Sequence, residues 1–285
     1  MAAELALPVD PRVSAFAGAI ASHYGESALA VLFYGSCLRS EQLDGLMLDF
    51  YLIVDDYDRA YDGRWLRLAN RLLPPNVFPW NHDGLVAKVA VLSVSDFERL
   101  CGRDADNVSV WARFAQPVRL VWSADVPVRE QMAAAMTQAA RTLFAHALPM
   151  MEPTQRGDAL AVWRRGFELT YGAELRAERA DRPGSVVDHA PGYYAETGAL
   201  LIAETIPPIA DADRRWRRLR RRGKLLTLAR LAKATTTYAG GIDYLAWKIN
   251  RHAGTQFVVK PWQRRHPILG ALTLLPRLLR SGAVR

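Results

Sequence analysis

Residues 47–54 read MLDFYLIV, an apolar run interrupted by a single aspartate, Asp49. Side chains along a β-strand alternate between the two faces of the sheet. One face of this strand is then wholly apolar and should pack on helices; it consists of Leu48, Phe50, Leu52 and Val54. Asp49 falls on the other face, with Met47, Tyr51 and Ile53. Because a carboxylate on a buried strand is costly unless a cation or hydrogen-bond donors meet it, this alternation predicts a polar site beside Asp49.

A glycine-serine turn precedes this strand. The strand-like residues 31–34 (VLFY) end at Tyr34, and Gly35 and Ser36 follow. A glycine turn lets backbone amides and the serine hydroxyl approach a phosphate closely. A strand, this turn and a second strand with Asp49 would set a triphosphate between the turn and a magnesium-binding carboxylate, a layout that resembles the nucleotidyltransferase fold. The alternative is an ordinary hairpin with Asp49 at a sheet edge.

The sequence pattern changes from strand-like to helical near residue 125. Strand-like stretches occur at 31–35, 47–54, 85–93 and 117–122, and helical patterns follow at 128–148, 159–179, 214–224 and 240–254. We therefore predict an α/β (α+β) fold. A nucleotidyltransferase-like domain with a mixed sheet should occupy residues 1–125, and a helical domain should occupy residues 126–285.

The composition excludes several classes of protein. Half of the 285 residues are apolar, which favours a packed core over a disordered chain. Two cysteines, Cys37 and Cys101, are too few for a disulfide framework or a zinc cluster, so we expect two free thiols in a reducing compartment. No stretch approaches the roughly 18 uninterrupted apolar residues of a membrane span. We expect neither secretion nor a transmembrane anchor.

The charge of +8 is distributed unevenly along the chain. Residues 214–285 hold 18 lysines and arginines against a single acid, Asp243, and the remainder of the chain is net acidic. The densest run is RRWRRLRRRGK at 214–224, with Trp216 and Leu219 interleaved. Together with the apolar C-terminal residues, this run is typical of a helix that lies on an anionic membrane surface. A solvated helix face is the alternative. The arginines expected to contact the membrane are Arg217, Arg218, Arg220 and Arg221.

Two further sites carry polar residues. Lys88 is the only charge in the strand-like GLVAKVAVL, and it could bind phosphate or snorkel from a sheet edge. Tyr171 and Glu174 lie three residues apart, a spacing that puts both on one face of a helix, where they could orient each other and a substrate. The spacing alone fits a surface tyrosine and an exposed salt-bridge former equally well.

Several of these motifs resemble one family of the nucleotidyltransferase fold. The matching stretches are Tyr34-Gly35-Ser36, the run LDFYLIVDD at 48–56, GLVAKVAVLS at 84–93, WARFAQPVRLV at 111–121 and LTYGAELR at 169–176. The chain is similar in them to the mitochondrial translocator assembly and maintenance protein family, whose members are peripheral CTP:phosphatidate cytidylyltransferases with bacterial relatives. The chain departs from the family pattern at Glu174, where the family has aspartate, and at Tyr57, where it has proline. Tyr51 stands where most nucleotidyltransferases have a second acid, and the family also lacks that acid.

The resemblance implies a set of site residues. Catalysis would fall to Asp49 and Lys88, with Asp49 also holding Mg²⁺. Nucleotide binding would fall to Tyr34, Gly35, Ser36, Tyr171, Glu174 and Arg176. Lys233 and Lys248, which follow the loose order of the family's C-terminal helices, would bind phosphatidate.

The implied reaction joins CTP and phosphatidate into CDP-diacylglycerol and diphosphate. Mg²⁺ is commonly held by one or two carboxylates plus substrate phosphates, so a lone Asp49 can serve. The expected location is cytoplasmic, peripheral on the inner face of the membrane, with no nucleic-acid partner. Two alternatives stay open: a nucleotidyltransferase with another acceptor, and an inactive nucleotidyltransferase-like domain that binds nucleic acid or membranes.

Overall fold

Strand β2 (Met47–Val54) lies at the centre of a five-stranded mixed sheet. A computed structural model of the chain describes residues 1–40, 42–174, 182–237 and 258–265. The strand order is β3-β4-β2-β1-β5, where β2 runs parallel to β4 and antiparallel to β1. The other strands are β1 (Ala28–Tyr34), β3 (Asn76–His82), β4 (Leu85–Ser93) and β5 (Arg119–Ser123). The predicted α/β class is confirmed.

The apolar face of β2 packs on helix α2 (Pro11–Tyr24), as the alternation predicts. The Phe50 ring centroid lies 5.4 Å from that of Phe16 on α2 and 5.3 Å from that of Phe33 on β1. The Asp10 side chain begins the helix by accepting a 2.8 Å hydrogen bond from the Arg12 amide, and Pro11 suits the first helical position. This face of the sheet is therefore closed by apolar packing.

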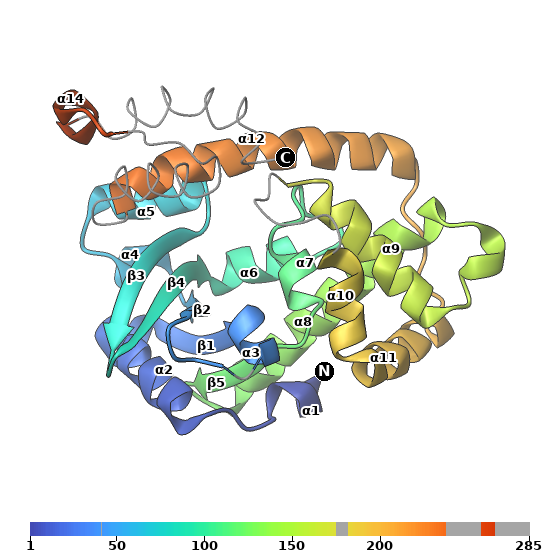
Figure 1. Ribbon diagram of the computed structural model, residues 1–285, viewed down its shortest axis with the longest axis horizontal. Coiled ribbons are helices and arrows are strands. Elements are labelled where there is room, and N and C mark those ends of the chain that lie inside the picture. The colour runs from blue at the N-terminus through green and yellow to red at the C-terminus, as the bar shows by residue number, and fades with distance from the viewer. Residues whose placement is uncertain (41, 175–181, 238–257, 266–285) are drawn as a thin grey trace.

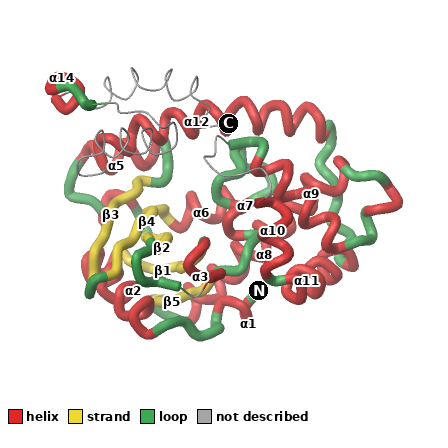
Figure 2. Tube along the Cα trace, in the orientation of Figure 1, coloured by secondary structure: helices red, strands yellow, loops and turns green. Residues whose placement is uncertain are grey.

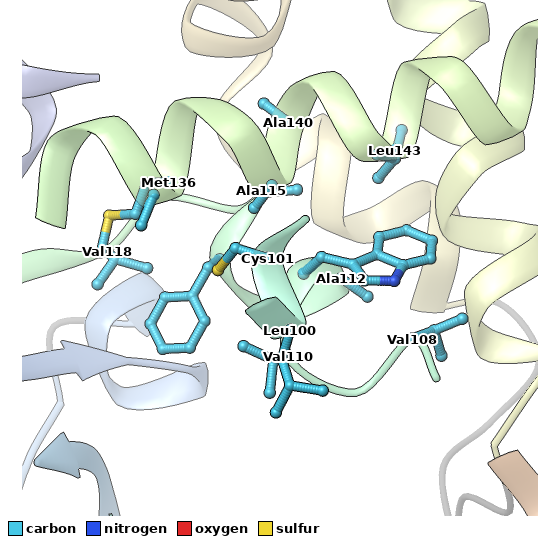
Figure 3. Packing of buried hydrophobic residues seen from close by; sticks show 14 of the residues in the cluster. Leu100, Cys101, Val108, Val110, Ala112, Ala115, Val118, Met136, Ala140 and Leu143 are labelled. Atoms are coloured by element: carbon cyan, nitrogen blue, oxygen red, sulfur yellow. The ribbon is translucent and has the colours of Figure 1, made fainter. Parts of the chain in front are cut away.

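The opposite face of the sheet packs on α6 (Val94–Cys101), α7 (Trp111–Phe114) and α8 (Val126–Ala147). Tyr51 on β2 contacts Phe114 of α7 with ring centroids 5.0 Å apart. Figure 3 shows Met136, Ala140 and Leu143 along one side of α8, packed over the residues of α6 and α7. The same hydrophobic cluster continues into the helical half of the chain. The division into two domains at residue 125 stays a prediction.

The helical half begins with α8, and Figure 2 shows it beside the sheet. The Asp125 side chain accepts a 2.8 Å hydrogen bond from the Val128 amide and so caps α8. The helices that follow are α9 (Ala159–Tyr171), α10 (Arg182–His189), α11 (Pro191–Ala203) and α12 (Ala212–Thr237). Shorter helices are α1 (Ala2–Leu5), α3 (Ser36–Ser40), α4 (Tyr57–Ala60), α5 (Arg64–Leu72) and α14 (Pro261–Arg265), with 3₁₀ turns at Gly25–Ser27, Leu148–Met150 and Pro153–Gln155.

Helix α12 runs lengthwise across the molecule, from the helical half to β3 of the sheet (Figure 1). Its inward residues recur every three or four positions, as one face of a helix requires. Trp216 and Leu219 are fully buried, and the Trp216 indole donates a 3.0 Å hydrogen bond to the His146 carbonyl. The interpretation of these two residues as membrane-facing is therefore wrong, because both belong to the protein core.

Gly223 allows α12 to lie close to the backbone at Ala173. A Cβ atom at this position would collide with the carbonyl oxygen of Ala173, just after the end of α9. This contact limits the size of the side chain at position 223 and brings α12 close to the residues that follow α9. The positions of the side chains further along α12 depend on this contact.

The state of the two cysteines and the hydropathy of the helices are both expected from the composition. Cys37 and Cys101 are both free and both buried, as expected. Burial raises the pKa of both thiols, so neither carries the mark of an activated nucleophile. None of the helices in the described ranges is both long enough and apolar enough to cross a bilayer.

Candidate active site

Three predicted site residues form a row across the sheet. Asp49 on β2 pairs with Tyr34 on β1 and with Lys88 on β4. Directly paired residues on neighbouring strands project their side chains from the same face. Neither β2 nor β4 is an edge strand. This excludes the alternative interpretations in which Asp49 or Lys88 lies at a sheet edge. The sheet therefore sets a carboxylate beside an ammonium group.

The turn after β1 passes directly against the carboxylate. Gly35 has a φ of 93°, in the region that favours glycine, and a Cβ atom built on it would lie 2.9 Å from Asp49 Oδ2. Ser36 is exposed and begins the short helix α3. Glycine at position 35 thus provides both the backbone conformation and the space beside Asp49.

A pocket of about 270 Å³ opens above this row of residues. Its floor is formed by the sheet residues Tyr34, Asp49, Tyr51 and Lys88. Its walls carry three cations, Arg113, Arg230 and Lys233, which we call the wall cations. Ser109, Pro75, Val77, Ala90 and Ala234 complete the lining. The pocket therefore collects residues from β1, β2 and β4, from β3 and α7 together with the residues just before each, and from the end of α12.

Arg113 on α7 is held from two sides. Its Nη1 donates to the carbonyl of Ser109, and the same nitrogen lies 3.7 Å from Glu174 Oε1. Burial alone would lower the pKa of Arg113, but the nearby Glu174 carboxylate leads the interactions that raise it above its ordinary value. Arg113 therefore stays charged while its guanidinium group is fixed beside the pocket.

Arg230 and Lys233 reach the pocket from α12. The Arg230 Nε donates a 2.9 Å hydrogen bond to the Pro74 carbonyl, and Lys233 Nζ donates to the carbonyls of Leu73 and of Pro75, the latter at 2.7 Å. Burial lowers the pKa of Arg230. Burial, and then the charge of Arg230, lower the pKa of Lys233 to about 7. The loop after α5 thus holds both cations in place.

The charge of the pocket favours an anionic ligand. Among the described residues that line it, four are cationic and one, Asp49, is acidic. In the described part of the chain, no carboxylate forms a salt bridge with Lys88 or Arg230. Because burial disfavours the charged form of Arg230, an incoming anion would offset part of the cost of its desolvation.

Asp49 is also the residue that could hold a divalent metal ion. No group of three or more histidines, cysteines or acidic residues suited to a metal occurs among the residues that the structure describes. Mg²⁺ often keeps several waters and is bound through one or two carboxylates plus substrate phosphates. One carboxylate facing a pocket whose described lining is rich in cations fits that mode of binding.

The structure brings together some predicted site residues and separates others. Tyr34, Gly35, Asp49, Lys88 and Lys233 meet at the pocket. Tyr171 packs against the hydrophobic core and does not line the pocket. The expectation that Tyr171 and Glu174 share a helix face is wrong, because α9 ends at Tyr171 and Glu174 lies beyond it. Glu174 does not line the pocket itself, but its Oε1 lies 3.7 Å from Nη1 of the lining residue Arg113. Arg176 and Lys248 lie outside the described residues.

The predicted membrane-binding arginines lie away from the pocket. Arg217, Arg218, Arg220 and Arg221 are all exposed on the outward side of α12. Two other arginines of the same run are tied to the protein: Arg215 donates to the Ala105 carbonyl, and Arg222 pairs with Asp106 at 2.5 Å. One side of the basic run therefore binds residues of the protein itself, and the other side is exposed and could contact a partner.

Sequence reasoning missed Arg113, Arg230 and Ser109. A signal for Arg230 exists, because it lies two helical turns after Gly223 and therefore on the inward face of α12. Arg113 is the one charge within the otherwise buried run WARFA, where a charge needs a partner. Ser109 carries no comparable signal.

Comparisons with known proteins add little to this geometry. No protein-family model matches the sequence, and no curated protein matches it. A solved structure of a nucleotidyltransferase-like protein from Exiguobacterium sibiricum 255-15 aligns with 95% of this chain and 92% of that chain, at 12% identity and a TM-score of 0.29. Similarity at that level does not carry an argument about chemistry, so the functional conclusion depends on the pocket itself.

Proposed function

We propose that the protein is a Mg²⁺-dependent nucleotidyltransferase. The observation that carries the proposal is the row of Tyr34, Asp49 and Lys88 on one sheet face, under a pocket walled by three further cations. A carboxylate that can hold Mg²⁺, a glycine turn against it and several fixed cations are the parts that phosphoryl-type transfer needs. Such transfer depends mainly on positioning and on neutralising phosphate charge.

In this reaction an acceptor oxygen forms a bond to the α-phosphorus of a nucleoside triphosphate. The bond between that phosphorus and the bridging oxygen breaks, and the electron pair leaves with diphosphate. Bound Mg²⁺ would neutralise phosphate charge and polarise the phosphoryl oxygens, and Asp49 is the residue that would hold it. Lys88, beside Asp49 on the floor, would contact the phosphates from the sheet.

The finer proposal is transfer of CMP from CTP to phosphatidate, which yields CDP-diacylglycerol. It draws on the sequence resemblance to the translocator assembly and maintenance family. It also draws on the exposed arginines of α12, which suit an anionic membrane surface at which a lipid acceptor would be met. Trp216 and Leu219 contribute nothing to that surface, since both are buried. Association with the cytoplasmic side of a membrane is part of the same proposal.

The test is an assay of purified protein with radiolabelled CTP and phosphatidate in mixed micelles containing Mg²⁺. Lipid-soluble label should appear only when phosphatidate is present, and Asp49→Asn should abolish it. The matched control is Asp55→Asn, because Asp55 follows the far end of the same strand and pairs with Arg59. Folded protein that forms no lipid-soluble label would contradict the lipid acceptor.

A second candidate is an anion-binding domain without catalysis. Tyr51 occupies the position of a second acid, and the surrounding cations bind anions whether or not a reaction follows. CTP binding without turnover, or strong salt-sensitive binding to RNA or DNA, would favour this candidate. Turnover of CTP with an acceptor other than phosphatidate would instead favour a different transferase.

A further inference from the structure

The sheet face that carries Asp49 has no second carboxylate at the positions nearest to it. Two residues along β2, where the side chain returns to the same face, stands Tyr51. Its side chain is buried, and its ring centroid lies 5.3 Å from that of Tyr34 and 5.0 Å from that of Phe114. Tyr51 therefore contributes an aromatic ring to the packing at this position and not a metal-binding carboxylate. Directly across on β4 stands Lys88. A second metal ion would find no carboxylate at either position.

The opposite side of the pocket is cationic and preorganised. The backbone carbonyls of Leu73, Pro74 and Pro75 hold Arg230 and Lys233. The Ser109 carbonyl and the Glu174 carboxylate hold Arg113. Each wall cation is therefore positioned before any ligand arrives, and binding does not have to order three long side chains.

We propose that the wall cations Arg113, Arg230 and Lys233 form a metal-independent subsite for the diphosphate part of a nucleoside triphosphate. They take the place of a second metal ion, so that the site works with one divalent ion at Asp49. The subsite neutralises the charge that develops on the departing diphosphate, and it does so with groups already fixed in the walls. Its role in catalysis rests on the proposed function, whereas its affinity for diphosphate does not.

The first test measures binding of inorganic diphosphate by calorimetry at pH 6, below the Lys233 pKa of about 7, in buffer stripped of divalent cations. The wild-type protein should bind, and Arg230→Gln and Lys233→Gln should each weaken affinity at least tenfold. Asp49→Asn should keep or gain affinity, because Asp49 is the acidic residue among the described residues that line the pocket. Lys224→Gln is the matched control, since Lys224 is an exposed cation on the same helix and should leave affinity unchanged.

Two results of this test would overturn the subsite. Diphosphate that binds the wild-type protein only when Mg²⁺ is added would show that the cations do not suffice. Unchanged affinity in both Arg230→Gln and Lys233→Gln would remove α12 from the site. Circular dichroism of each variant separates loss of binding from loss of fold, and Arg113→Lys, which keeps a cation beside Glu174, provides a milder third variant.

The second test counts metal ions. Mn²⁺ is titrated into the protein together with a non-hydrolysable CTP analogue, and bound Mn²⁺ is followed by electron paramagnetic resonance. One bound ion per chain is expected, and two would contradict the proposal. Asp49→Asn should lose the bound ion while the analogue stays bound through the wall cations.

The outcomes separate this inference from the proposed function. Metal-free diphosphate binding in a protein that transfers no nucleotide would leave the subsite standing and reject the transferase. Nucleotide transfer in a protein that binds no diphosphate without metal would reject the subsite and leave the transferase standing.

Discussion

Lys88 lies directly opposite Asp49 on the neighbouring parallel strand, and both side chains project from the same face of the sheet into the pocket. Replacing Lys88 with alanine removes a charged donor beside the reacting phosphates. We expect kcat/KM to fall by about 10²-fold in steady-state assays with CTP, as is typical for the loss of one such donor. Lys88→Arg should restore part of the loss. An unchanged rate in Lys88→Ala would assign this lysine to the structure of the pocket alone.

Gly35→Ala should damage the metal site at Asp49. The new methyl group would lie 2.9 Å from Asp49 Oδ2, and the positive φ adds strain of about 1 kcal/mol. Gly45→Ala is the control, because Gly45 also has a positive φ but nothing lies within 4 Å of the added methyl. Both variants should lose similar stability in thermal melts. Only Gly35→Ala should weaken Mn²⁺ binding, and equal Mn²⁺ affinity in the two would contradict the assignment.

Gly223→Ala should loosen α12. The added methyl collides with the Ala173 carbonyl, so α12 must shift outward, at a cost of about 1–3 kcal/mol in the free energy of unfolding. Arg230 and Lys233 lie further along the same helix, so metal-free diphosphate binding should weaken as well. Gly18→Ala in α2, where nothing lies within 4 Å, should lower neither property, because alanine is a better helix former than glycine. Urea denaturation and calorimetry measure the two effects separately.

Lys233 should make the stability of the ligand-free protein depend on pH. Its pKa is lowered from 10.5 to about 7, first by burial and then by the charge of Arg230. Between about pH 7 and 10.5 the unfolded chain therefore holds a proton that the folded protein has lost, and raising the pH favours the folded state. Urea melts of the wild type should gain stability relative to Lys233→Met between pH 7 and pH 9. Parallel pH profiles for the two proteins would show that Lys233 keeps an ordinary pKa.

Neutralising the exposed face of α12 should weaken membrane binding more than catalysis. The variant replaces four residues with glutamine: Arg217, Arg218, Arg220 and Arg221. Each cation near an anionic surface contributes about 1 kcal/mol, so affinity for phosphatidylglycerol-containing vesicles in sedimentation assays should fall steeply. Activity on detergent-dispersed phosphatidate should change little. The control removes the same charge elsewhere, at the exposed Arg64, Arg99, Arg129 and Arg164. Equal vesicle binding by both variants would reject α12 as the contact surface.

The alternation of apolar residues was sufficient to predict β2 and the placement of Asp49. It separated Leu48 and Phe50, which pack on α2, from Asp49, which faces the pocket. The same reasoning missed β3, because Pro79 and several polar residues break its apolar pattern. Proline is tolerated there because β3 is an edge strand that pairs only with β4. Edge position is a property of the whole sheet and cannot be read from the strand itself.

The floor of the pocket was predictable from the sequence, but its walls were not. Tyr34, Asp49 and Lys88 belong to local patterns in which an apolar strand carries one polar residue. Arg113 and Arg230 come from elements distant in the sequence, and only the packing of α7 and α12 brings them to the sheet. The end of α9 was a smaller error with a visible signal, since Gly172 directly follows the last helical residue.

One uninterrupted helix supplies both core residues of the helical half and cations of the pocket, so the spacing between them is under a strict geometric constraint. Inserting or deleting one residue between Gly223 and Arg230 would rotate everything beyond it by about 100° around the helix axis. Trp216 and Leu219 would stay in the core while Arg230 and Lys233 turned toward solvent. Related chains that keep this pocket should therefore tolerate length changes in their loops but preserve the length of α12 between these positions.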